Sequence, residues 1–153
     1  MDKARKVFTI VELIAAVGIV AIVAAIAVPI YSGIEQKVRV SAALGDMGQI
    51  EIAIARFLTK DNGALPANLA VVGLDTLNDP WGNPYQYLNI EANPDTGIGA
   101  VRKNRNLMPI NSDYDLYSMG KDGKSDSPLT ATESKDDIVR GANGAYFGLA
   151  GDF

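Results

Sequence analysis

Apolar side chains fill the chain almost without interruption from Phe8 to Tyr31, and Glu12 is the one charged residue in this stretch. Roughly twenty apolar residues, rising about 1.5 Å each in a helix, span a hydrocarbon core of about 30 Å. Three basic residues stand in the short segment ahead of the stretch, which by the positive-inside rule keeps the N-terminus cytoplasmic. The pattern therefore predicts one transmembrane helix, with the rest of the chain on the far side of the membrane.

A cleaved secretory signal peptide is the competing interpretation of this stretch. Signal peptides have a shorter apolar core and end at a cleavage site of small residues. Here the apolar run reaches Val28-Pro29-Ile30 and continues into helix-compatible sequence. The length of the run favours a single-pass anchor.

The helical pattern continues beyond the membrane segment, but with a different periodicity. From residue 32 to 60 apolar positions recur every three or four residues, which is typical of an amphipathic helix. These positions are Val40, Leu44, Met47, Ile50, Ile54, Phe57 and Leu58. Asp61-Asn62-Gly63 then signals a helix end. We expect one helix from about Phe8 to Thr59, apolar all round over 8–31 and amphipathic over 32–60, where it docks on a globular domain at 61–153.

Strand-like patterns appear in the C-terminal domain. The proline-rich turn at 79–84 leads into an alternating run at 85–90, and a second run covers 114–119. We expect these runs to pair as antiparallel strands, with a turn at 93–97 between them. The predicted fold class is therefore α+β, with a long N-terminal helix and a small antiparallel β-sheet.

Two further segments of this domain have less definite patterns. Residues 64–78 fit either a short helix or an extended turn. Residues 141–153 contain too many large apolar side chains for a loose tail, so we expect them to form a final strand or a subunit contact.

Composition excludes several kinds of chemistry. The chain of 153 residues has no Cys and no His, which removes thiol catalysis, disulfides, Cys/His zinc sites and the commonest general base. Its net charge is −4 and no basic patch with interleaved aromatics is present, which argues against nucleic acid as the main partner. We do not expect an enzyme.

The start of the apolar stretch resembles the prepilin signature of type IV pilins and type II secretion pseudopilins. Phe8-Thr9-Ile10-Val11-Glu12-Leu13 is followed by small and β-branched apolar residues and then by Pro29. In that family the mature chain starts at the Phe, a Glu lies four residues later, and a Pro lies near the membrane exit. The resemblance implies that Glu12 and Pro29 serve filament assembly.

Glu12 needs an explanation on physical grounds, because a carboxylate in a membrane-spanning helix costs a few kcal/mol. A position close enough to the interface to stay hydrated is the simpler explanation. The resemblance implies instead that Glu12 meets the terminal amine of a neighbouring subunit inside a helical filament. Two charges in an apolar filament core are tolerable only when each meets the other.

The resemblance also implies processing of the basic leader (1–7). A dedicated prepilin peptidase would cut between Val7 and Phe8 and methylate the new N-terminus. The family's leader ends in Gly, however, and Val7 stands at that position here. Cleavage elsewhere, a retained leader and an altered sequence all stay open as alternatives.

An acidic loop near the end of the domain is a candidate metal site. Asp122, Asp126, Asp136 and Asp137 cluster among Gly and Ser residues, without the spacing of an EF-hand. Calcium takes six to eight oxygens from carboxylates and backbone carbonyls on flexible loops. A solvated acidic loop explains the cluster equally well.

The C-terminal domain resembles the globular domain of the cysteine-free major pseudopilins of type II secretion, which carry calcium. The resemblance lies in DPWGNPY at 79–85, YSMGKDG at 117–123 and DDI at 136–138. It implies side-chain calcium ligands at Asp122, Asp136 and Asp137, with backbone carbonyls near Met119 and Ser134 completing the shell. The loop between these motifs is longer than is usual in the family.

We therefore predict a structural subunit of a type IV pilus-like filament, either the type II secretion pseudopilus or a surface pilus. The resemblance implies a precursor in the bacterial inner membrane, which a cytoplasmic ATPase and a membrane platform assemble with copies of itself into a periplasmic or extracellular filament. The alternative is a single-pass anchored domain that binds calcium or a partner without polymerising.

Overall fold

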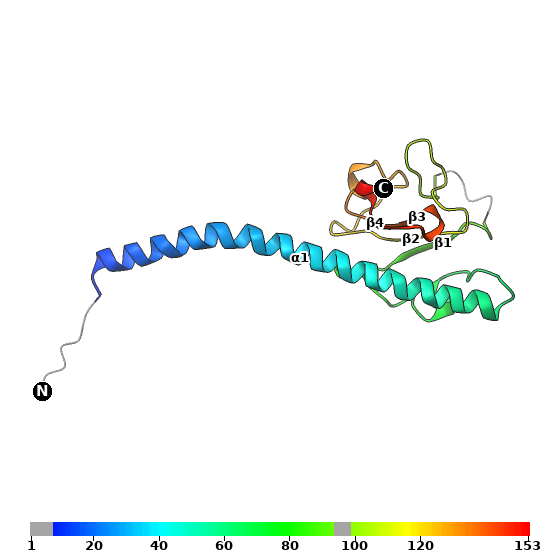
Figure 1. Cartoon of the computed structure of the whole chain (residues 1–153), viewed down its shortest axis with the longest axis horizontal. Coiled ribbons are helices and arrows are strands. Elements are labelled where there is room, and N and C mark those ends of the chain that lie inside the picture. The colour runs from blue at the N-terminus through cyan, green and yellow to red at the C-terminus, as the bar shows by residue number, and fades with distance from the viewer. Residues whose placement is uncertain (1–7, 94–98) are drawn as a thin grey trace, which may run out of the picture. The chain divides into compact units, whose positions relative to one another are not determined.

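The computed structural model describes residues 8–93 and 99–153 (Figure 1). Val7 and most of the turn predicted at 93–97 lie outside the described residues. The chain divides into two compact units, Met1–Val38 and Arg39–Phe153. We call the first the anchor unit and the second the head unit, and describe each by itself.

One helix, α1 (Ile10–Lys60), accounts for most of the N-terminal sequence. Its bounds confirm the predicted helix of about 8–59, and it continues through Pro29 without a break. It ends where Asn62 and Gly63 take left-handed backbone angles, with φ of 53° and 87°. The Gly63 N–H then donates to the Leu58 carbonyl at 2.8 Å, which satisfies one of the free carbonyls at the helix end.

The head unit contains a four-stranded antiparallel sheet in the order β1-β2-β3-β4. Its strands are β1 (Gln86–Asn89), β2 (Tyr114–Ser118), β3 (Ile138–Gly141) and β4 (Tyr146–Leu149). The pairing of β1 with β2 confirms the two predicted strands, and β4 shows that the C-terminal segment packs within the domain. Strand β3 has no counterpart in the sequence-based prediction.

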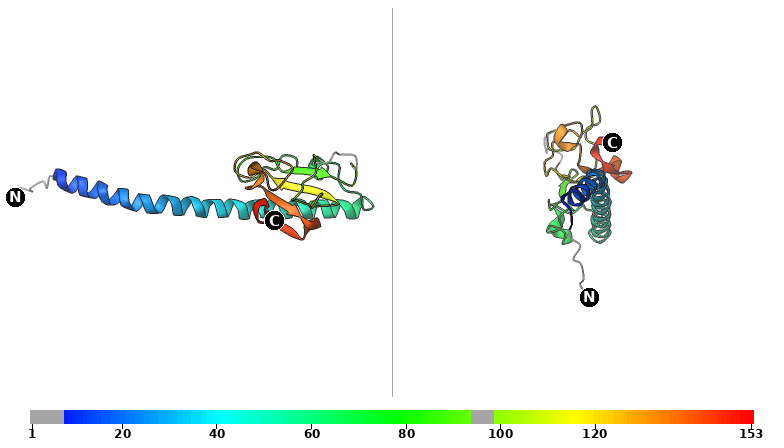
Figure 2. Two further views of the ribbon diagram at one scale, coloured as in Figure 1. Left: turned by 90° about the horizontal axis from the view of Figure 1, so that it is seen from above. Right: turned by 90° about the vertical axis from the view of Figure 1, so that its left-hand side faces the viewer.

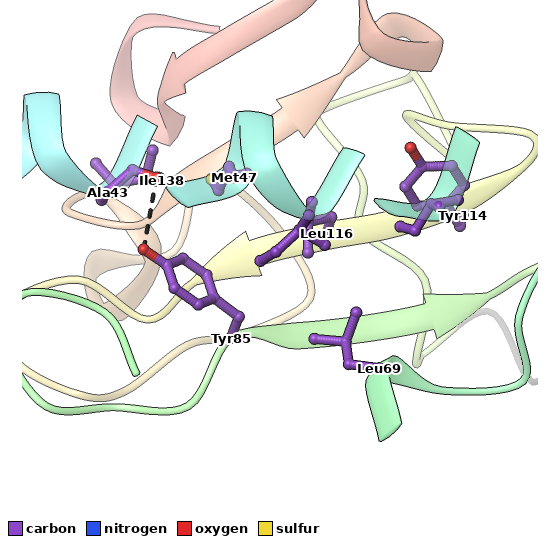
Figure 3. Packing of buried hydrophobic residues seen from close by; sticks show 9 residues of the cluster. Ala43, Met47, Leu69, Tyr85, Tyr114, Leu116 and Ile138 are labelled. Atoms are coloured by element: carbon purple, nitrogen blue, oxygen red, sulfur yellow. Dashed lines mark hydrogen bonds between the residues drawn. The ribbon is translucent and has the colours of Figure 1, made fainter. Parts of the chain in front are cut away.

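One face of the sheet packs against the head unit's part of α1, which runs beside the strands in Figure 1 and in the left view of Figure 2. From the helix, Ala43, Met47, Ile50 and Ile54 are buried, at a spacing of three and four residues. Figure 3 shows how side chains from the sheet and the preceding segment meet them, namely Leu69, Tyr85, Tyr114, Leu116 and Ile138. Each large apolar side chain buried here stabilises the fold by about 1.5–3 kcal/mol, so this layer is the main core.

The opposite face of the sheet is also covered, although no α-helix of the described residues lies on it. A second apolar cluster consists of Ile110, Leu129, Val139 and Ala150. Tyr117 of β2 packs against this cluster, whereas its neighbour Leu116 belongs to the main core, as the alternation of a strand requires. Connecting loops and the C-terminal segment therefore take the place of a second layer.

The segment at 64–78, left open by the sequence, holds a short 3₁₀ helix at Leu69–Val72. Asn68 caps it, because its side-chain oxygen accepts from the Val71 N–H at 3.3 Å. The following turn is organised by Asp79, whose carboxylate accepts from the backbone N–H groups of Trp81 and Asn83 at 3.0 and 2.8 Å. The single Trp, Trp81, packs against the main core.

A polar cluster ties α1 to the sheet within the head unit. The buried Arg140 guanidinium donates to both carboxylate oxygens of Asp113, at 2.9 and 2.8 Å, and to Glu51 of α1 at 3.3 Å. It also lies 3.9 Å from the centre of the Tyr114 ring. Burial alone raises the pKa of Asp113, but hydrogen bonds from Arg140 and from the Tyr114 N–H outweigh it and hold the pKa below its usual value.

Candidate functional site

The anchor unit presents a largely apolar helix surface. Every residue from Phe8 to Glu35 is exposed, including Ile14, Ile22 and Val28 at 65–66%. In the described part of the chain, one helix is long and apolar enough to cross a membrane by length and composition. An apolar surface of this extent needs lipid or other protein surfaces to cover it.

Glu12 caps the first turn of α1. Its carboxylate accepts from the backbone N–H and the hydroxyl of Thr9, at 2.9 and 2.8 Å, while the Glu12 N–H donates to the Thr9 hydroxyl at 3.2 Å. This reciprocal arrangement is a capping box, which satisfies N–H groups that the helix start leaves free. Sequence reasoning missed the role of Thr9, although the spacing T-x-x-E signals it.

Pro29, the second predicted assembly residue, lies inside α1. Because Pro has no N–H, it cannot donate to the carbonyl four residues earlier in the helix. One turn later the Ser32 hydroxyl donates to the Pro29 carbonyl at 3.0 Å. Helix α1 therefore tolerates Pro29 at the cost of one backbone hydrogen bond.

The structure brings the two ends of the predicted metal loop together. The N–H groups of Lys121 and Asp122 donate to Asp136 Oδ2 at 2.8 and 3.1 Å. Gly120, with φ of 63°, lies so close that a Cβ there would meet the Asp136 carbonyl oxygen at 2.3 Å. Gly120, which directly follows Met119 in the chain, is therefore packed against Asp136.

The other predicted ligands have different partners. The exposed Asp122 uses Oδ1 to accept from the Lys124 N–H at 2.8 Å. The buried Ser134 hydroxyl donates to the Asp126 carbonyl at 2.7 Å and accepts from the Asp126 N–H at 2.9 Å. Among the residues that the structure describes, no three acidic side chains converge in a way that could hold a metal ion.

Asp137 is fully buried and ion-paired with Arg102, itself only 2% exposed. The Ser125 hydroxyl also donates to Asp137 Oδ2, at 2.5 Å. Burial raises the pKa of Asp137 to about 6, against the hydrogen bonds from Ser125 and Arg102, which lower it. Sequence reasoning missed Arg102, since no local pattern connects it with a carboxylate 35 positions away.

These contacts do not fit the calcium shell that the resemblance implies. Two of the predicted side-chain ligands already have other partners. Asp136 Oδ2 accepts hydrogen bonds from backbone N–H groups, and Asp137 Oδ2 is paired with the Arg102 guanidinium. The buried Asp137 Oδ1, by contrast, has no hydrogen-bond partner among the described residues, which favours an added cation there. Calcium binding stays a prediction of the resemblance, which the geometry of this loop does not support.

Comparison with known proteins identifies the family of this chain. Type II secretion system core protein G of Pseudomonas aeruginosa is 32% identical over 138 residues, an alignment that covers 76% of this chain and 84% of that protein. The chain belongs to the type II secretion core protein G family. No protein-family model and no solved structure matches it.

Membership of this family confirms the resemblance read from the N-terminal signature and the head, and also the pilin-like fold. Core protein G is a major pseudopilin, so the chain is a structural protein and not an enzyme. The long apolar helix start fits anchoring in the inner membrane.

Proposed function

We propose that the chain polymerises with copies of itself into the pseudopilus of a type II secretion system. The observation that supports this most strongly is the exposed apolar surface of the anchor unit, with Glu12 as the one charge in the apolar stretch. A helix of this kind is stable in lipid and equally stable in a bundle of identical helices. The same surface can therefore leave the inner membrane and form the core of a periplasmic filament.

Processing of the leader is part of this proposal. Cleavage between Val7 and Phe8 by a prepilin peptidase, followed by methylation, would create an amine at Phe8, two residues before α1 begins. Intact mass and N-terminal sequencing of the protein from its native membrane are the direct measurements. A start at methylated Phe8 is expected, and a start at Met1 would contradict this step.

Glu12 has two separable roles under this proposal. Within one chain it caps α1 through Thr9. In the filament its charge would meet the terminal amine of a neighbouring subunit, because a buried charge without a partner is strongly destabilising. The platform and ATPase that drive assembly would then add subunits in one register.

The variant Glu12→Gln separates the two roles. Gln also serves in capping boxes, since its amide oxygen accepts hydrogen bonds, but it carries no charge. In cells that contain the secretion machinery, we expect Glu12→Gln to reach the membrane at the normal level. Its yield of pelletable filament should fall about 100-fold, the effect of removing one partner from a buried ion pair.

Glu35→Gln is the matched control, because Glu35 belongs to the same helix and follows the apolar stretch. We expect it to assemble normally. Normal assembly of Glu12→Gln would contradict the charge-pairing role. If the wild-type chain also failed to form filaments, the competing function would be favoured, which is a single-pass anchored domain that binds a partner without polymerising.

A further inference from the structure

The loop at 119–137 has a buried negative charge that requires a counter-charge. Asp137 is 0% exposed and lies directly before β3. An unpaired carboxylate in this position would be strongly destabilising, and proteins avoid this by pairing it or by binding a metal ion. The question is therefore which cation balances Asp137.

Arg102 brings its guanidinium to this carboxylate. Nη2 pairs with Asp137 Oδ2, while Nη1 donates to the Ser125 hydroxyl and to the Asp126 carbonyl, both at 2.6 Å. One side chain thus binds a hydroxyl, a carbonyl and a carboxylate of a single loop, which are oxygen ligands of the kinds that a hard cation takes.

The position of Arg102 is fixed from the sheet side. Its backbone N–H donates to the buried Asp115 carboxylate of β2 at 2.7 Å, and its guanidinium lies 4.2 Å from the centre of the Tyr117 ring. Cation–π contact is strongest when the guanidinium is desolvated, as it is here. The Arg102 guanidinium is therefore held between the loop at 119–137 and the face of the sheet that points away from α1.

We propose that Arg102 is the resident cation of this loop, so that the head unit reaches its full stability without a bound metal ion. A divalent ion at the Asp137 carboxylate would lie next to a buried positive charge and be repelled by it. The calcium that the resemblance implies is thus replaced by a side chain of the same polypeptide.

The first test uses the wild-type full chain in detergent micelles. Thermal unfolding of the head unit is followed by the fluorescence of Trp81, the single Trp, in excess calcium chloride and in excess chelator. We expect the same midpoint in both. A midpoint that rises in calcium would overturn the proposal, whether or not any variant can be purified.

The second test removes the guanidinium. Arg102→Met keeps much of the side-chain volume but leaves Asp137 unpaired, and should lower the midpoint by about 10 °C or more. Arg105→Ala is the matched control, because Arg105 is exposed and lies three positions along the same segment. It should change nothing measurable.

A double-mutant cycle assigns the effect to the ion pair. Arg102→Met combined with Asp137→Asn should be more stable than Arg102→Met alone, because the uncompensated charge is gone. Additive effects of the two substitutions would overturn the pairing. These measurements report only on stability of the head unit, so their failure is distinguishable from failure to polymerise.

Discussion

Helix α1 has the same apolar residue types in two different environments. Ile22, in the anchor unit, is 65% exposed, whereas Ile50, in the head unit, is 0% exposed. The chain itself provides partners for Ile50 but none for Ile22 among the described residues. The apolar side chains of α1 in the head unit thus stabilise the fold of one subunit. Those in the anchor unit are available to lipid or to other subunits.

Truncation of the buried position should produce the largest effect. Ile50→Ala removes a side chain from the main core, which should lower the free energy of unfolding of the head unit by about 2–5 kcal/mol. Urea unfolding of the full chain in micelles, followed by Trp81 fluorescence, measures this change.

Two controls sharpen the contrast between the parts of α1. Ile52→Ala makes the same change two positions on, where the side chain is 55% exposed, and Ile22→Ala makes it in the anchor unit. Both should leave the head unit within about 0.5 kcal/mol of wild type. A loss for Ile22→Ala equal to that for Ile50→Ala would contradict the division of the helix into two environments.

We expect an intermediate effect on the stability of the head unit from the ion pairs of Arg140, which connect the head unit's part of α1 to the sheet. Among the ion pairs of the described residues, Arg140 pairs with Asp113 and with Glu51. Asp113→Asn removes the first of these charges and leaves Glu51 as the carboxylate partner of Arg140. We expect a loss of about 1–3 kcal/mol at pH 7.

The pH dependence of this loss follows from the pKa of Asp113, which is lower in the folded chain than its usual value. Ionised Asp113 therefore contributes fully above about pH 4, and its contribution is lost as the pH falls through the folded-state pKa. The difference between wild type and Asp113→Asn should shrink at low pH. Chemical denaturation at several pH values would show this, and a constant difference would argue against the ionised pair.

The smallest effect on the head unit should come from the N-terminal cap. Thr9→Ala removes the capping box and should destabilise the first turn of α1 by about 1 kcal/mol, which raises hydrogen exchange there about fivefold. The head unit should unfold as in the wild type. Unchanged exchange at Ile10–Leu13 would show that the capping box contributes nothing in micelles.

Periodic patterns made the large elements predictable. The apolar run and the three-to-four spacing gave the bounds of α1 to within two residues at its start and one at its end, and alternation located β1 and β2. Ala43 was not predicted to be buried, because a small residue weakens the pattern that larger neighbours define.

The polar interior could not be predicted in the same way. Arg102 and Arg140 look like ordinary surface residues in the sequence, and each becomes buried only because its partners come from distant segments. Strand β3 was missed because the aspartates before it suggested a metal loop. The acidic cluster predicted a metal site, with a solvated loop as the alternative, but the cation that pairs with Asp137 in the structure is Arg102, which lies outside the cluster.

The Arg102 contact has a consequence for the conditions under which this protein can work. A bound ion stabilises a fold by an amount that grows with its free concentration. A guanidinium on the same polypeptide has an effective concentration fixed by the chain, and dilution cannot remove it. If the proposal holds, each new copy is synthesised with its counter-ion already attached, so we expect its head unit to tolerate surroundings where dissolved calcium is scarce or variable.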